Sequence, residues 1–128
     1  MREPVWVDRL VVEVVHSAQL VEHGGLPGIR DDNALEAALA RPKQKWHYEK
    51  ADLPTLAAAY AFGLCQGHPF RDGNKRSAFL TMLIFLGLNG RELEAEESDV
   101  VAVMLSLASG ELGERELVGW VKGRLRKK

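Results

Sequence analysis

The chain has 128 residues, of which 46% are hydrophobic; this is enough for one hydrophobic core, so we predict a single domain over residues 1–128. Its 17 basic and 18 acidic residues give a net charge of −1, whereas a protein that binds nucleic acid directly usually carries a basic excess. The longest apolar run, residues 78–88, is too short to cross a membrane. The lone Cys65 has no disulfide partner within the chain, which is typical of a reducing compartment, so we expect a cytoplasmic protein.

The first predicted helix spans residues 7–21. Apolar residues recur there every three or four positions, which places them on one helix face: Val7, Leu10, Val11, Val14, Val15, Ala18 and Val21. His16 lies in this segment, and we interpret it as a hydrogen-bonded core histidine. The glycine-rich segment 24–28 then ends the helix, because glycine and proline favour turns.

A second, short helix is predicted from a cap within residues 31–33 to Ala40, because Asp and Asn side chains accept the free N–H groups of a first turn. We expect Pro42 to end this helix. In the polar stretch 41–50, Trp46 and Tyr48 alternate about a histidine, which favours a short extended segment.

Four more helices are predicted in the rest of the chain. One opens at Asp52 with a proline two residues behind it and runs to about Gln66. The run 78–88 is apolar nearly all round, so it is predicted to be the central helix of a bundle. Two further helices centre on residues 100–107 and 117–121. The chain is therefore predicted to be all-α, a compact bundle of about six helices.

The loop before the apolar helix combines the groups that a phosphate-transfer site needs, in the order His68-Pro69-Phe70-Arg71-Asp72-Gly73-Asn74-Lys75-Arg76. Gly73 and Asn74 lie where the loop becomes a helix, and the unpaired N–H groups of a helix start bind anions. Lys75 and Arg76 add positive charge there, and the fork of Arg76 can bind phosphate at two points. This junction is therefore a candidate phosphate site.

Two other side chains of this loop are suited to chemistry. Asp72 is an oxygen ligand of the kind that Mg²⁺ takes together with substrate phosphates. The imidazole of His68 can take a proton from an attacking hydroxyl. Taken singly, such residues are often only parts of a turn or of a solvated surface, but their coincidence in one loop favours a functional site.

This loop resembles the signature of the Fic superfamily, H-x-F-x-[DE]-[GA]-N-x-R, at every fixed position: His68, Phe70, Asp72, Gly73, Asn74 and Arg76. The chain length resembles that of the Doc (death-on-curing) branch, as do segment 24–28, Tyr48-Glu49 and Asn89-Gly90. The resemblance implies a Fic fold with a short flap before the motif loop.

The position of Lys75 separates the branches of this superfamily. Fic enzymes that transfer nucleotides usually have glycine there, whereas in Doc-like toxins a lysine accompanies transfer of the γ-phosphate of ATP. The resemblance therefore implies a toxin that phosphorylates a Thr or Ser hydroxyl of a protein, elongation factor Tu, and so blocks translation. ATP and Mg²⁺ would be required.

The resemblance also assigns roles to the loop residues. His68 would be the general base and Asp72 the Mg²⁺ ligand. The anion nest and the phosphate-binding side chains would be supplied by four residues: Gly73, Asn74, Lys75 and Arg76.

Two alternatives to this kinase function stay open. The first is a Fic-type nucleotidyl (AMP) transferase that acts on a protein hydroxyl, which Gly73 favours because glycine is the commoner Fic choice at that position. The second is a catalytically silent binding module that keeps the fold. The intact His68, Asp72 and Arg76 argue against it.

The resemblance also bears on protein partners. In Fic-like proteins a flap before the motif pairs with the target chain like a strand; residues 41–50 occupy that place, so Trp46 and Tyr48 either grip the target or simply anchor the loop on the core. We find no inhibitory [S/T]-x-x-x-E-[G/N] stretch. The implied inhibitor is a small antitoxin of the prevent-host-death type, whose disordered C-terminal segment folds into a groove on the toxin.

Overall fold

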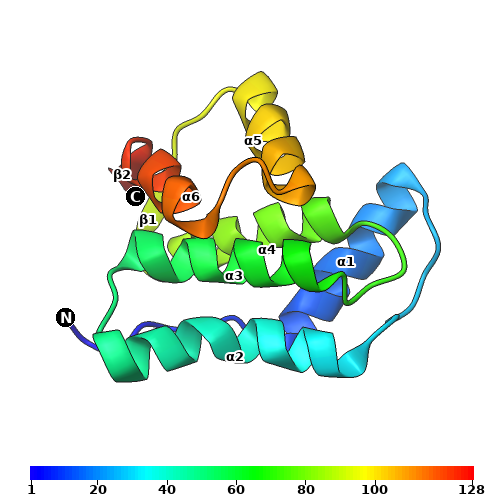
Figure 1. Ribbon diagram of the computed structural model, residues 1–128, viewed down its shortest axis with the longest axis horizontal. Coiled ribbons are helices and arrows are strands. Elements are labelled where there is room, and N and C mark those ends of the chain that lie inside the picture. Colours follow the sequence, from blue (N-terminus) through cyan, green and yellow to red (C-terminus); the bar gives the residue numbers. More distant parts are fainter.

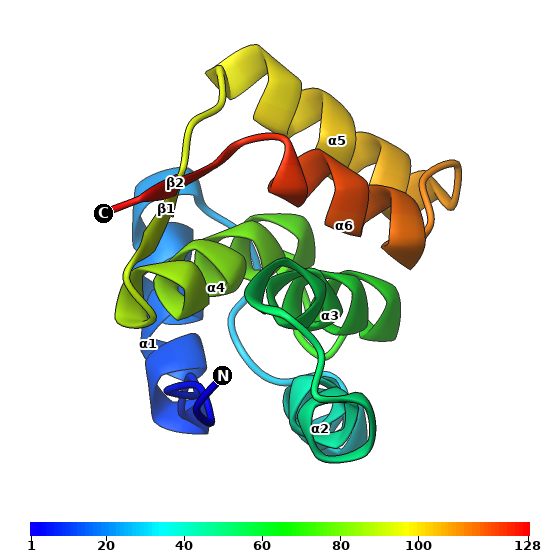
Figure 2. The ribbon, with the colours of Figure 1, turned by 90° about the vertical axis from the view of Figure 1, so that its left-hand side faces the viewer.

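The computed structural model describes residues 1–128 and confirms the prediction of an all-α protein with six helices. The elements are α1 (Arg9–His23), α2 (Asp32–Glu49), α3 (Leu53–Gly67), α4 (Asn74–Leu88), β1 (Arg91–Leu93), α5 (Glu97–Ser109), α6 (Glu114–Lys122) and β2 (Leu125–Lys127). The two strands pair antiparallel, with Glu92 opposite Arg126. Figure 1 shows α3 and α4 across the middle of the molecule, and Figure 2 shows α5 and α6 on one side of this pair and α2 on the other.

Helices α3 and α4 are at the centre because both carry small or apolar residues on most of their surface. Nine residues of α3 are buried, and five of them are alanines or a cysteine that let neighbouring helices come close. At Gly63 a Cβ atom would lie only 3.2 Å from Ala38 Cα, so the absence of a side chain sets the approach of α2 to α3. The core contains 23 buried hydrophobic residues drawn from all six helices and the adjoining segments.

Helix α1 turns a different face to the core from the one that its apolar spacing predicts. Its buried residues are Val12, His16 and Gln19, which recur at intervals of four and three. Leu10 and Val21, both expected in the core, are 71% and 90% exposed. The predicted face is wrong. The polar His16 and Gln19 are buried instead, because their side chains form hydrogen bonds with backbone carbonyl groups of the motif loop.

Residues 41–50 are not an extended flap; this prediction is wrong, because they form the second half of α2 and its C-terminal cap. Pro42 lies inside the helix and is buried. The helix continues because of tertiary packing. Its buried residues form one stripe along the helix, on both sides of the proline and including it: Leu35, Ala38, Leu39, Pro42 and Trp46. Burial of this stripe against α3 offsets the hydrogen bond that the proline cannot make.

Several helix ends agree with the sequence pattern. Asp31 accepts a hydrogen bond from the Ala34 N–H at 3.0 Å and caps α2, and Asp52 accepts one from the Thr55 N–H at 3.1 Å and caps α3. Gly110 ends α5 in the left-handed conformation, at φ 87°. None of the helices combines the length and the apolar character that a membrane span requires.

Candidate active site

The motif loop, residues 68–73, joins the end of α3 to the start of α4 through two left-handed residues. His68 follows the last residue of α3 with φ 46° and ψ 53°, and Gly73 precedes α4 with φ 76°. These two conformations turn the chain back on itself. As a result the Asn74 Nδ2 atom, in the first turn of α4, lies 3.4 Å from His68 Nδ1.

Asn74 holds the motif loop from inside. Its Oδ1 accepts a hydrogen bond from the Phe70 N–H at 3.0 Å, and its Nδ2 donates to the Phe70 carbonyl at 2.9 Å. These two bonds fix the orientation of the buried amide, so it presents an N–H group to His68 Nδ1. The neutral imidazole in this arrangement therefore carries its proton on Nε2.

Helix α1 holds two carbonyl groups of the loop. His16 is buried, stacks on Phe70 with the ring centres 3.8 Å apart, and donates from Nε2 to the Asp72 carbonyl at 2.8 Å, which confirms the interpretation of a hydrogen-bonded core histidine. Gln19 Nε2 donates to the Gly73 carbonyl at 3.1 Å. These two bonds from α1 fix the carbonyl groups of the two residues that precede α4.

The first turn of α4 is open to anions. The N–H groups of Asn74, Lys75 and Arg76 have no hydrogen-bond partner within the protein. The side chains of Lys75 and Arg76 are exposed and form no ion pair. A free helix N-terminus beside two unpaired cations is a place of positive potential.

These groups line a cleft of about 910 Å³ between the end of α1, the start of α4 and α5. The cleft brings together five of the six predicted site residues of the motif: Asp72, Gly73, Asn74, Lys75 and Arg76. His68 is exposed but is not part of its lining, and its link to the cleft runs through Asn74. The opposite wall, from α5, is apolar apart from Glu97 and includes Val101 and Leu105, both about half exposed.

Asp72 has one carboxylate oxygen bound by a neighbour and one that is free. Its Oδ2 accepts a hydrogen bond from the Leu26 N–H at 2.7 Å, and no bond occupies Oδ1. Gly25 permits this approach, since a Cβ there would lie 3.1 Å from the Asp72 Cβ, and its φ of 122° suits glycine alone. No group of three His, Cys, Asp or Glu side chains lies close enough to hold a metal. The donor set fits Mg²⁺ bound by one carboxylate and by substrate phosphates.

A strand-like segment does lie beside the motif, but it is residues 28–30. Ile29 pairs with Phe70 in an antiparallel bridge; the Arg71 N–H donates to the Gly28 carbonyl at 3.1 Å and the Arg30 N–H to the Pro69 carbonyl at 2.7 Å. The sequence pattern predicted only a turn over the glycine-rich segment 24–28, and no strand over residues 28–30. No local pattern pairs residues 29 and 70, because the contact joins distant parts of the chain.

Comparison with known proteins agrees with this geometry. Residues 6–86, well over half of the chain, match the model of the Fic/DOC family. The chain belongs to the Fic/DOC family. The chain is 33% identical over 99 residues to the protein kinase doc of Escherichia phage P1, a match that covers 77% of this chain and 78% of that protein. It is 39% identical over 87 residues to the toxin Doc of Mycolicibacterium smegmatis, and there the match covers 66% of each chain. These relatives place it in the Doc branch.

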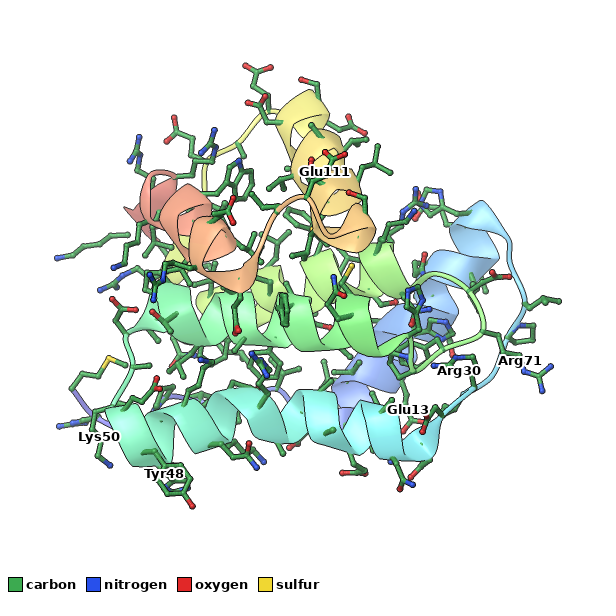
Figure 3. The ribbon with its side chains drawn as sticks, in the orientation of Figure 1. Glu13, Arg30, Tyr48, Lys50, Arg71 and Glu111 are labelled. Atoms are coloured by element: carbon green, nitrogen blue, oxygen red, sulfur yellow. The ribbon has the colours of Figure 1, made fainter.

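Within this Fic/DOC domain, the two aromatic residues predicted to dock a target lie away from the motif loop. Trp46 is 6% exposed and packs in the core, where Lys50 Nζ lies 4.9 Å from the centre of its ring. Tyr48 is 87% exposed and points away from the body of the protein on the far side of α2 (Figure 3). Their alternation in sequence does not reflect a strand, because both residues are helical.

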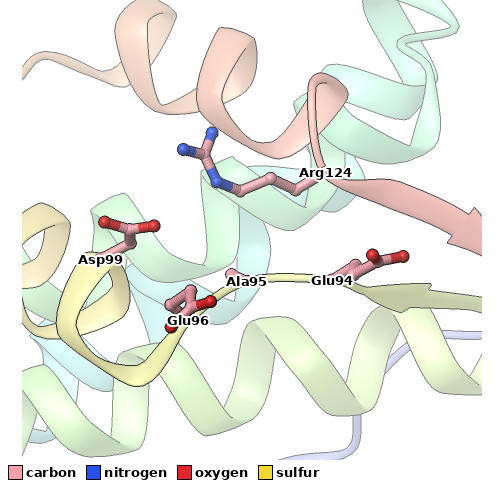
Figure 4. Close-up of a pocket in the computed structure, with 5 residues that line it drawn as sticks. All are labelled: Glu94, Ala95, Glu96, Asp99 and Arg124. Carbon is pink, nitrogen blue, oxygen red and sulfur yellow. The ribbon is translucent and has the colours of Figure 1, made fainter.

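Two other features of this Fic/DOC chain do not belong to the site. A second cleft of about 300 Å³ is lined by three carboxylates and one arginine (Figure 4): Glu94, Ala95, Glu96, Asp99 and Arg124. Its negative charge repels phosphate, and no motif residue reaches it. Burial raises the pKa of the Cys65 thiol, although the charge of Lys75 lowers it in part, so this core residue stays protonated and is a poor nucleophile.

Proposed function

We propose that the protein is a Doc-like toxin that transfers the γ-phosphate of ATP to a Thr or Ser hydroxyl of a protein, with elongation factor Tu as the target. The observation that carries the proposal is the open first turn of α4. There, free N–H groups, Lys75 and Arg76 share one cleft with Asp72. Both relatives bear the name Doc, and one is called a protein kinase and the other a toxin.

The roles of the motif residues follow from where their polar atoms lie. The backbone of Gly73 and Asn74 and the side chains of Lys75 and Arg76 would bind the phosphates of ATP. Asp72 would hold Mg²⁺ through its free Oδ1. The ion, when bound, neutralises charge on the phosphates.

His68 would be the general base for the target hydroxyl. To accept a proton at Nε2, the ring must carry its own proton on Nδ1, so the contact with Asn74 has to open when the target binds. At 3.4 Å this contact is long for a hydrogen bond, and opening it costs little. His68 is exposed, so its imidazole is accessible to a target chain.

The structure supports a local explanation for Gly73. Gln19 Nε2 lies 2.0 Å from the position that a Cβ atom would occupy there, and the residue has a positive φ. A side chain here would displace Gln19 and strain the backbone, so packing in this chain favours glycine, whatever is transferred. The residue that favoured nucleotidyl transfer then no longer separates the two reactions, whereas Lys75 still favours the kinase.

The test uses purified elongation factor Tu and ATP labelled at either the γ- or the α-phosphate. We expect γ-label on the factor, and loss of the label in the His68→Ala variant. The control is His47→Ala, which removes an exposed histidine of α2 far from the motif in sequence. Label arriving from the α-phosphate would establish an AMP transferase instead. Growth arrest that persists in His68→Ala would indicate the silent binding module.

We further propose that the same cleft receives the C-terminal segment of a small antitoxin of the prevent-host-death type. Exposed Val101 and Leu105 face the cleft, and an amphipathic helix can lay its apolar side on such a wall. A segment bound there would cover Lys75 and Arg76 and prevent ATP from binding.

This partner can be tested in cells that express the toxin. Co-expression of a small antitoxin encoded beside the toxin gene should relieve growth arrest. Leu105→Lys should weaken this relief, whereas Val21→Lys should not, because Val21 is exposed on α1 outside the cleft lining. Equal relief in both variants would place the antitoxin elsewhere.

A further inference from the structure

Arg30 binds three successive carbonyl groups around His68. Its Nε donates to the His68 carbonyl at 2.7 Å, its Nη2 donates to the Gly67 carbonyl at 3.1 Å, and its backbone N–H donates to the Pro69 carbonyl at 2.7 Å. The residue lies just before α2, and Figure 3 shows its side chain beside the loop that follows α3. No other side chain forms a hydrogen bond with the carbonyl groups of Gly67 and His68.

The turn that Arg30 binds is intrinsically disfavoured. His68 is one of only two non-glycine residues with a positive φ, and its left-handed conformation crowds the Cβ atom against the backbone. A conformation of this kind persists only where surrounding contacts hold it. The last carbonyls of α3 also carry the negative end of the helix dipole, which a guanidinium group stabilises.

The imidazole of His68 is held from the other side by Asn74, at the 3.4 Å contact with Nδ1. That contact is weak and acts on the ring alone. The direction in which the ring leaves the backbone depends on the φ and ψ of His68. Arg30 controls those angles, because it binds the carbonyls on both sides of the His68 Cα atom.

We propose that Arg30 is a positioning residue for His68: it holds the end of α3 in the left-handed conformation that keeps the imidazole beside the start of α4, both before and after the contact with Asn74 opens. This inference rests on the proposed function, in which His68 is the general base. Arg30 itself touches no reacting group. Its planar fork is required, because the three N–H groups of a lysine ammonium leave a single nitrogen atom and cannot bind these two carbonyls in the geometry of Arg30 Nε and Nη2.

The kinetic test compares Arg30→Gln and Arg30→Lys with Arg115→Gln, which removes an exposed arginine of α6. We expect Arg30→Gln to lower kcat for phosphoryl transfer at least tenfold and to leave the KM for ATP within twofold, since the phosphate-binding groups are untouched. Arg30→Lys should have a kcat almost as low as that of Arg30→Gln. Arg115→Gln should resemble the unchanged protein.

A second readout does not depend on activity. The protein has four histidines, so the ring signals can be assigned in a ¹H–¹³C NMR spectrum by means of the His68→Ala variant. We expect Arg30→Gln to shift or broaden the ring signal of His68 and to leave those of His16, His23 and His47 in place.

The outcomes separate this inference from the proposed function. An active His68→Ala variant would refute the general-base role, while the NMR comparison would still test the position of the ring. If His68→Ala is inactive but Arg30→Gln keeps its kcat and the His68 signal, the inference alone is wrong. It is also wrong if both Arg30 variants lose all native histidine signals, because Arg30 is then required for folding in general.

Discussion

At the scale of single residues, the site depends on which backbone groups are bound and which are free. Side chains from outside the loop bind its carbonyl groups: Arg30, His16 and Gln19. The N–H groups at the start of α4 are left without partners. Carbonyls bound inward and N–H groups left outward produce a local positive potential with few charges.

Gly73 provides a first prediction about stability. Gly73 and Gly90 have nearly the same φ, 76° and 77°, but a Cβ at Gly73 would meet Gln19 Nε2 at 2.0 Å, while nothing lies within 4 Å of one at Gly90. Gly90→Ala should therefore lower the free energy of unfolding by backbone strain alone, about 1–2 kcal/mol. Gly73→Ala should cost about 1 kcal/mol more, because Gln19 loses its hydrogen bond to the Gly73 carbonyl. Urea denaturation measures both, and equal losses would show that Gln19 moves aside without cost.

Tyr60 provides a prediction about pH. Its hydroxyl accepts a hydrogen bond from the Val7 N–H at 3.0 Å, and burial raises the pKa of the phenol from 10.0 to about 12. Above pH 10 the unfolded chain loses this proton while the folded chain keeps it. The contribution of Tyr60 to stability is therefore complete below pH 10 and falls as the pH rises toward 12.

The chain has only two tyrosines, so the Tyr48→Phe variant isolates Tyr60. We expect its phenolate absorbance to appear near pH 12 in the folded protein and near pH 10 after unfolding in urea. A folded-state midpoint at 10 would contradict the burial of the hydroxyl.

At the scale of elements, burial decides where helices end and which faces they turn inward. Helix α2 continues through Pro42 because its apolar stripe packs on α3 on both sides of the proline. Helix α1 leaves several apolar residues exposed, because the face that it buries places His16 and Gln19 beside the motif loop. Arg9 also joins the two helices from α1, through ion pairs with Asp32 and Glu36. Its guanidinium holds the pKa of the Asp32 carboxyl below its usual value.

The orientation of α1 can be tested with two valines of the same helix. Val12 is fully buried and Val14 is 58% exposed, although the apolar spacing places Val14 and not Val12 in the core. Val12→Ala should lower the free energy of unfolding by about 2 kcal/mol, from two lost methyl groups and the cavity they leave. Val14→Ala should change it by less than about 0.5 kcal/mol. The reverse order in thermal or urea denaturation would mean that α1 presents the other face.

At the scale of the whole molecule, the charge of the protein is nearly balanced and the positive site is local. The net charge is −1, so the protein as a whole does not attract a triphosphate. Attraction arises at the free N–H groups of α4, where Lys75 and Arg76 form no ion pair, although Glu22 and Glu97 also line the cleft. The acidic residues of the second cleft do not line this site; they share their own cleft with Arg124.

Two arginine variants with the same change in net charge test this arrangement. Arg76→Gln should weaken the binding of ATP at least about tenfold, since a charge-assisted phosphate contact is worth about 1.5–3 kcal/mol. Arg115→Gln on α6 should leave the affinity unchanged. Calorimetric titration with ATP and Mg²⁺ measures both. Equal weakening would mean that the overall charge, and not the local site, governs nucleotide binding.

Most of the helices were predicted correctly from local sequence patterns, and the predictions that are wrong have physical causes. Asp52 was predicted at the start of α3, and Asp31 was one of three candidate caps of α2, because a cap is a contact between residues three apart. Residues 41–50 were assigned wrongly because a proline in an isolated helix is costly, and only packing against α3 offsets that cost.

For the candidate site too, local features could be predicted from the sequence and long-range contacts could not. The nine residues of the motif, their charges and the helix that follows them could be recognised in the chain, because the groups that meet there are close in sequence. The neighbours that hold the motif could not: Arg30, His16 and Gln19 lie between 37 and 58 residues from the atoms they bind. Only the tertiary structure brings them together, because their contacts depend on how α1 and the start of α2 pack against α3 and α4.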